Sequence, residues 1–267
     1  EIGLLEDRVS VNMDYYDKKT KNLLFSKPLP NTSGFGSIET NIGEVKYYGF
    51  EIGVNALLVD KADFNLELGV NASHNMNKVL RLPENGFDKN RIGGIRFTDG
   101  TGVGGVAEGE RMFGVIGYLP DFIIDNEEQA ANAMYDFRAA GWDPATGKAI
   151  KGQKFPGDFE WVDLNGDGKI TNNDTQILGH VVPTTTGGMH TKVTYKGFEF
   201  YILTDFALGH SIYDRQISLL NAYGESGYIS PTTDVLDAWQ AEGDAAKTDI
   251  PRFDVQDGSN TGQWNYY

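Results

Sequence analysis

The fold is decided by residues 49–73, which read GFEIGVNALLVDKADFNLELGVNAS. From 50 to 58 an apolar residue stands at every second position, and only Leu57 breaks the alternation. Residues 64–73 repeat the pattern, with Glu67 and Asn71 among the polar members. A period of two is typical of a strand with one apolar and one polar face. The stretch therefore predicts a hairpin of two long strands with a tight turn at Asp60-Lys61.

The same alternation recurs on both sides of this hairpin. It predicts further strands over 9–16, 189–195 and 198–208, and Lys196-Gly197 is suited to a two-residue turn between the last two. Short and long connections take turns along the chain, because long segments follow residues 16, 73 and 208. In an up-and-down barrel this order places all short turns on one rim and all long loops on the other, as in outer-membrane barrels.

Strand length separates a barrel from a β-sandwich. Ten residues at about 3.4 Å each, tilted by roughly 40°, rise about 26 Å, close to the ~25 Å apolar band of outer-membrane barrels. Sandwich strands average about 5 to 6 residues, with loops of mixed length at both ends. The sequence thus predicts an all-β fold, a transmembrane antiparallel β-barrel segment with long extracellular loops that contain short helices. We expect Val54, Leu68 and Phe200 to face lipid, and Glu51, Glu67 and Glu199 to face the lumen.

Two helices are expected within the long loops. Residues 127–140 have acidic residues in the first turn, Asn126 or Asp125 as N-cap, and Gly141 just past the end. A second, shorter helix is expected around residues 233–239.

Composition excludes some classes of protein. The chain carries 38 Asp and Glu against 23 Lys and Arg, a formal charge of -15, which disfavours nucleic-acid binding. The absence of Cys excludes disulfides and thiolate metal sites. The first residues resemble no signal peptide, so the chain is either cytosolic or an interior fragment. Because there is no initiating Met and the end is abrupt, we favour the fragment.

One loop has the spacing of a calcium site, over residues 163–174 (DLNGDGKITNND). Side-chain oxygens from positions 1, 3 and 5, a carbonyl from position 7 and a carboxylate at position 12 surround Ca²⁺ in such loops, and a Gly at position 6 allows the sharp turn. The candidate metal ligands are Asp163, Asn165, Asp167, the Lys169 carbonyl and Asp174. We expect a structural Ca²⁺, with Mg²⁺ as the less favoured ion. The alternative is a Gly-, Asn- and Asp-rich turn that binds no metal.

Catalytic motifs give no support for an enzyme. The sequence contains no G-x-S-x-G, H-E-x-x-H or P-loop, and its four His show no ligand spacing. Residues 100–105 satisfy G-x-G-x-x-G without the strand and helix that would give it meaning, and we interpret them as a flexible loop. The aromatic residues Trp142, Trp161 and Tyr118 could stack on sugar rings or belong to a small core. We therefore do not expect an enzyme.

The order of segments resembles a known family. It runs through residues 11–24 (VNMDYYDKKTKNLL), 28–35 (PLPNTSGF) and 41–45 (NIGEV), and continues through the loop at 163–174 to Tyr195-Lys196-Gly197-Phe198. This order is similar to the C-terminal barrel portion of SusC/RagA-type TonB-dependent outer-membrane transporters. Residues 179–183 depart from the turn usual in that family.

The resemblance implies a function. It implies a barrel in the bacterial outer membrane, plugged by an N-terminal domain and energised through TonB, that imports oligosaccharides or peptides together with a SusD-like surface lipoprotein. Residues 1–267 would then be part of the barrel, without the plug domain and the terminal strands, and the lipoprotein would cover the rim with the long loops. The alternative is a surface-exposed or secreted, calcium-stiffened, β-rich glycan-binding module. An extracellular hydrolase is a third.

Overall fold

The computed structural model describes residues 2–143, 148–212, 214 and 232–252. The chain divides into two compact units. The first contains residues 1–93, 105–114 and 180–211, and the second contains 94–104, 115–179 and 212–267. Much of the long segment predicted after residue 208 lies outside the described residues.

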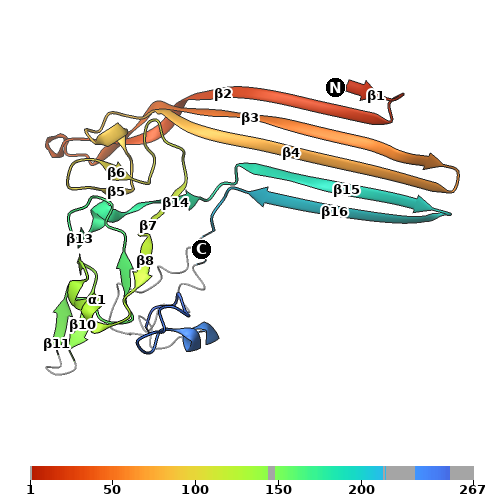
Figure 1. Ribbon diagram of the computed structural model, residues 1–267. Helices are drawn as coiled ribbons and strands as arrows, with labels where there is room; N and C mark the ends of the chain where they lie inside the picture. The colour runs from red at the N-terminus through yellow and green to blue at the C-terminus, as the bar shows by residue number, and fades with distance from the viewer. Residues whose placement is uncertain (1, 144–147, 213, 215–231, 253–267) are drawn as a thin grey trace. The chain divides into compact units, whose positions relative to one another are not determined.

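A six-stranded antiparallel sheet forms the first unit (Figure 1). In spatial order its strands are β1 (Ile2–Leu4), β2 (Val9–Pro28), β3 (Ser37–Lys61), β4 (Phe64–Arg81), β15 (Thr185–Tyr195) and β16 (Phe198–Leu208). All five predicted strands are confirmed within these bounds. The β15–β16 turn has positive φ at Lys196 (45°) and Gly197 (86°), as a two-residue type I′ hairpin turn requires.

The first hairpin is much longer than expected. The long connection predicted after residue 16 is wrong, because β2 and β3 stay paired from Val9–Ala56 to Pro28–Ser37 around a short helical tip, η1 (Asn31–Ser33). The register shifts between Thr20 and Leu23, where Asn22 adopts a φ of 59°. A bulge of this kind reverses the alternation of faces. That reversal hid the continuing strand from the period-two pattern.

Strands β4 and β15 are neighbours although residues 82–184 separate them in sequence. Their register runs from Phe64–Tyr195 to His74–Thr185 without a shift. The β3–β4 and β15–β16 turns meet at the Phe64–Tyr195 end, while the long connections leave from the other end. The predicted rim of short turns is confirmed within this unit. At the opposite end the connection after β4 is long, whereas only residues 29–36 join β2 to β3.

Two segments of the long connection fold back onto the sheet. Leu82 and Met112, from the segments 82–93 and 105–114, pack with Val45 and Val79 in a small buried cluster. The Met112 amide donates to the Asn77 side chain at 2.8 Å, and the Leu82 amide donates to Glu108 at 2.7 Å. A short helix, η2 (Asp88–Asn90), lies in the first segment. These segments therefore cover one face of the sheet at the end from which the long connections leave.

Outside this sheet the strands form short pairs. These are β5 (Ile95–Arg96) with β6 (Gly102–Val103), β7 (Gly114–Gly117) with β14 (Gln176–His180), β8 (Pro120–Ile123) with β12 (Phe159–Trp161), β9 (Tyr135–Asp136) with β13 (Lys169–Ile170), and β10 (Ala140–Asp143) with β11 (Lys148–Lys151). The second unit has its own core of Tyr118, Ile123, Phe159, Trp161 and Ile170.

The longer predicted helix is confirmed only at its start. Helix α1 (Glu127–Asn132) is capped by Asn126, whose side chain accepts from the Gln129 amide at 3.0 Å. The prediction of helix up to residue 140 is wrong, because the Met134 amide donates to the Glu160 carboxylate instead and the chain continues as β9. The second expected helix is present as the 3₁₀ turn η4 (Thr233–Asp237). In the part of the chain that the structure describes, no helix is both long and apolar enough to cross a membrane.

Candidate functional site

The six-stranded sheet has two chemically different faces. One cross-strand row contains Val11, Val54, Val70 and Met189, and the next contains Asn12, Gly53, Asn71 and Gly188. Successive residues of a strand point to opposite faces, so one face is apolar and the other polar. Val54, Leu68 and Phe200 fall on the apolar face, and Glu51, Glu67 and Glu199 on the polar one. Whether these faces meet lipid and lumen stays a prediction.

Aromatic rows bound the apolar face at both ends. Phe64, Tyr195 and Phe198 stand in register beside the short turns, and Tyr15, Phe50 and His74 stand in register toward the long loops. The Phe50 and His74 rings stack at 5.7 Å between centroids. Ten residues of β4 separate the two rows, a rise of about 26 Å for a strand tilted by roughly 40°. This is the height of the apolar band of an outer-membrane barrel.

The polar face is hollowed between β2, β3 and β4. The lining residues are Asn12, Asp14, Glu51, Ile52, Gly53, Asn71, Ala72 and Ser73, around a shallow cavity of about 290 Å³. Beside it the Tyr16 hydroxyl donates to the Asn75 side chain, which in turn donates to Ser73 at 2.6 Å. Carboxylates, amides and hydroxyls can exchange hydrogen bonds with hydroxyl or peptide groups of a passing solute.

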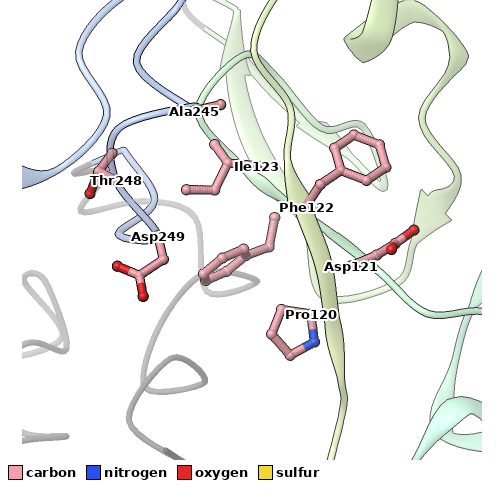
Figure 2. Close-up of a pocket in the computed structure, with 8 residues that line it drawn as sticks. Pro120, Asp121, Phe122, Ile123, Ala245, Thr248 and Asp249 are labelled. Atoms are coloured by element: carbon pink, nitrogen blue, oxygen red, sulfur yellow. The ribbon is translucent and has the colours of Figure 1, made fainter.

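A second pocket lies in the second unit of the chain, which we call the loop unit, between β8 and the segment 245–249 (Figure 2). It encloses about 370 Å³, with Phe122, Ile123 and Phe159 as apolar lining and Asp121 and Asp249 as acidic groups. Phe122 is 44% exposed, so its ring is available to a ligand. No sequence motif pointed to this pocket, because its two walls are more than a hundred residues apart.

Asp125 ties the two walls of this pocket together. Its carboxylate accepts hydrogen bonds from Trp239 Nε1 at 2.9 Å, the Gly243 amide at 2.8 Å and the Ala245 amide at 3.2 Å. The Trp239 hydrogen bond is the main reason why the pKa of Asp125 lies below its usual value. A carboxylate with three donors fixes the 239–245 segment beside the end of β8.

The loop aromatics are mostly core residues. Trp161 is fully buried and Tyr118 is buried beside it, with Arg138 stacked 3.7 Å from the centre of the Tyr118 ring. Asp136 fixes this guanidinium, with Oδ2 2.7 Å from Arg138 Nη2. Of the two readings for the aromatics, the structure supports the core reading for Trp161 and Tyr118. The side chain of Trp142 lies outside the described residues.

Sequence reasoning did not detect the buried ion pair Lys154–Glu160. The Lys154 side chain is fully buried and that of Glu160 is 5% exposed. The same carboxylate also accepts from the amides of Met134 and Trp161, at 3.0 and 3.1 Å. Lys and Glu rarely lie inside a protein unless they are paired, so nothing in a single sequence marks these two among many exposed charges.

The predicted calcium loop forms a tight turn on the second unit. Asp163 accepts from the amides of Gly166 (2.7 Å) and Gly168 (2.8 Å), and Asp167 accepts from the Lys169 amide at 2.9 Å. The closing Asp174 is buried and accepts from the amides of Leu164 and Thr171 at 3.0 and 2.7 Å. Asn165 contacts the Asp167 carboxylate at 3.1 Å.

Burial acts to raise the pKa of Asp163, but the amides of Gly168 and Gly166 outweigh it and keep the pKa below its usual value. Within the described ranges, no three His, Asp or Glu side chains lie close enough together to hold a metal ion. The donor set, oxygen atoms only, has the chemistry that Ca²⁺ prefers.

Comparison with known proteins gives a consistent result. Residues 1–191 match the family model "TonB dependent receptor-like, beta-barrel". The chain is 28% identical to TonB-dependent receptor P3 of Formosa agariphila, over 100% of this chain and 24% of that protein. It is 27% identical to the TonB-dependent receptor SusC of Bacteroides thetaiotaomicron, over 86% of this chain and 20% of that protein.

A solved structure shares the fold. The RagAB peptide importer in the "open-open" state superposes with a TM-score of 0.62 at 17% identity, over 94% of this chain and 24% of the matched one. The chain thus spans about a quarter of the length of TonB-dependent receptor P3 and of the matched RagAB chain.

Proposed function

Because this chain belongs to the TonB-dependent receptor-like β-barrel family, whose SusC and RagA members lie in the outer membrane, we propose that it forms part of the wall and outer loops of a nutrient importer. The observation that carries this proposal is the two-faced sheet. Its apolar face is bounded by two aromatic rows about 26 Å apart, and its other face is polar.

Exposed apolar side chains distinguish this proposal from the water-soluble binding module. Met13, Phe198 and Phe200 are 69%, 80% and 62% exposed on the same face. A soluble protein rarely exposes a contiguous apolar patch of more than a few hundred Å². Lipid satisfies this face, and an aqueous lumen satisfies the opposite one.

The solute is proposed to be hydrophilic and neutral or cationic. The hollow on the polar face carries Asp14 and Glu51, and the loop pocket carries Asp121 and Asp249. None of the described residues that line these two sites is Lys or Arg. Oligosaccharides and peptides have the hydroxyl, amide and ammonium groups that such surfaces bind, whereas polyanionic glycans would be repelled.

Two protein partners complete the proposal. A SusD-like lipoprotein would cover the long-loop rim, and TonB would supply energy through the N-terminal part of the full-length receptor. The long excursion of 82–184 supports the lid, because long ordered loops in compact proteins usually serve a function. Recovery of the intact receptor without any lipoprotein, after mild solubilisation of the native membrane, would contradict the lid.

Spin labels in the full-length receptor test the orientation of the sheet. Labels at positions 54, 68 and 200 should be relaxed by oxygen dissolved in lipid, and labels at 51, 67 and 199 by a water-soluble nickel complex. Each pair of positions, 54 with 51, 68 with 67 and 200 with 199, compares the two faces of one strand at similar depth. If the first set responds to the nickel complex and not to oxygen, the barrel-wall assignment is wrong.

We further propose that Asp163, Asn165, Asp167, the Lys169 carbonyl and Asp174 bind one structural Ca²⁺. The position-by-position match to a calcium loop and a donor set made of oxygen atoms only support this proposal. Bound Ca²⁺ would show oxygen distances of about 2.3 to 2.6 Å, and Mg²⁺ about 2.0 to 2.1 Å. Calorimetric Ca²⁺ binding that persists unchanged in an Asp163→Asn/Asp167→Asn receptor would disprove the site.

A further inference from the structure

Three lysines stand side by side on neighbouring strands of the sheet. Lys19 of β2 is paired with Lys46 of β3, and Lys46 is paired with Lys78 of β4. Lys19 and Lys78 are exposed, and the Lys46 side chain is 29% exposed. We call Lys19, Lys46 and Lys78 the lysine row.

The lysine row lies on the apolar face of the sheet. Lys78 is four residues beyond His74 and Lys46 is four residues before Phe50, so each shares the face of its aromatic residue. On the opposite face at this height, Val45 and Val79 are buried under Leu82 and Met112. The ammonium groups therefore project away from the folded-back segments.

Distance from the aromatic row places these lysines at headgroup level. Four residues at about 3.4 Å, tilted by roughly 40°, rise about 10 Å above the Phe50–His74 row. The headgroup layers add about 5 to 8 Å on each side of the hydrocarbon core. A lysine stem is long enough to return its ammonium group to that layer.

The local charge is opposite to that of the whole chain. Toward the long connections, β2, β3 and β4 are basic. Seven Lys and Arg but only three Asp and Glu lie within residues 15–28, 37–48 and 75–81, in a chain of net charge -15. Asp17 neutralises part of the row, with Oδ2 2.7 Å from Lys46 Nζ. Like charges directly opposite one another destabilise a sheet. A bound anion would reduce this repulsion between the lysines of the row.

We propose that the lysine row binds the phosphate groups of lipid headgroups in the outer leaflet. This rests on the outer-membrane location of the family and on the orientation of the sheet, and it is independent of the transported solute. Phosphate oxygens would bridge Lys19 and Lys78 across the Lys46–Asp17 pair and relieve the repulsion between them. The row would thereby hold a shell of lipid around this part of the wall.

The test compares two matched double variants of the full-length receptor in detergent. Lys19→Gln/Lys78→Gln removes two ammonium groups of the row and leaves Lys46–Asp17 intact. The control, Lys18→Gln/Lys192→Gln, removes two lysines from the polar face, where Lys192 pairs with Glu199 at 3.1 Å. Native mass spectrometry would measure binding of bisphosphorylated lipid A and of its dephosphorylated form, with inorganic phosphate as competitor.

A lysine near an anionic lipid surface contributes about 1 kcal/mol, so the row variant should bind bisphosphorylated lipid A on the order of ten- to thirty-fold more weakly. The control should match the unmodified receptor. Equal binding of both lipid forms, or equal loss in both variants, would overturn the proposal. If inorganic phosphate displaced bound lipid A as effectively as unlabelled lipid A does, the row would be a site for free anions, and the proposal would also be overturned. If the double variant fails to fold, the exposed Lys78→Gln alone carries the test, with Lys18→Gln as its control.

Discussion

The Arg91 guanidinium is buried against the Glu110 carboxylate, with Nη2 2.7 Å from Oε1 and Nη1 3.0 Å from Oε2. Only 1% of the Arg91 side chain is exposed, whereas 22% of Glu110 is. A two-point contact of this kind between charged groups is among the stronger hydrogen-bonded pairs in proteins. It links the segments 82–93 and 105–114 that cover one face of the sheet.

Glu110→Gln should loosen this cover. The change leaves a buried guanidinium without its main counter-charge, although Asp88 remains 3.5 Å away, so we expect a loss of about 2 to 3 kcal/mol. Hydrogen exchange should speed up at the amides of Val79 and Met112. Lys89→Gln is the control, since Lys89 binds the same carboxylate from a half-exposed position, and it should cost less than about 1 kcal/mol. Equal effects of both variants would refute this account.

The same pair predicts a dependence on pH. Burial acts to raise the pKa of Glu110, but the hydrogen bonds from Arg91 and Lys89 outweigh it and hold the pKa below 4.5. A depressed folded-state pKa stabilises the fold above the unfolded value, and this stabilisation is lost as pH falls through the folded value. Protease cleavage within 82–114 should therefore increase below about pH 4.5. The Glu110→Gln receptor should lack this rise.

An added charge should reduce the free energy of unfolding by different amounts on the two faces of β3. Val54 lies midway between the aromatic rows on the apolar face, and Asn55 is its neighbour on the polar face. Val54→Arg should cost about 2 to 4 kcal/mol on folding into lipid vesicles, because a lipid-facing arginine at the membrane centre is poorly solvated. Asn55→Arg should cost much less. Urea titration of refolded receptor measures both, and equal costs would speak against a lipid-facing Val54.

Breaking the Lys154–Glu160 pair should destabilise the loop unit. Lys154→Met leaves the Glu160 carboxylate buried, with two amide donors and no cation, at a cost of about 3 to 5 kcal/mol. Exchange protection should fall around β12 while the six-stranded sheet keeps its own. Lys151→Met, at an exposed neighbouring position, is the control. Wild-type protection of β12 in the Lys154→Met receptor would disprove this role.

The sheet could be predicted because its residues alternate over whole strands. Phe64 to Ser73 show the period without error, and each residue lies on the expected face. The upper half of the first hairpin could not be predicted in this way. The bulge at Asn22 reverses the faces, and Val45 is buried by Leu82 and Met112, which are distant from it in sequence.

The loop unit escaped prediction for a different reason. Helix α1 begins where its cap predicts, but its end is set by Glu160, which lies 26 residues away from Met134. The pocket beside Phe122 depends on Asp125 holding Trp239 across 114 residues. Such tertiary hydrogen bonds override local propensity, and a single sequence carries no periodic signal for them.

The pairing of β4 with β15 has a consequence for how the sheet assembles. Two residues close the β3–β4 and β15–β16 hairpins, whereas 103 residues lie between β4 and β15. Loop-closure entropy makes the longer closure costlier by about 3 to 4 kcal/mol. We therefore expect the hairpins to form early and the β4–β15 seam to zip late. Until the seam closes, the edges of β4 and β15 are open to pairing with other strands. We therefore expect assembly factors to act mainly by shielding these two edges from wrong pairing.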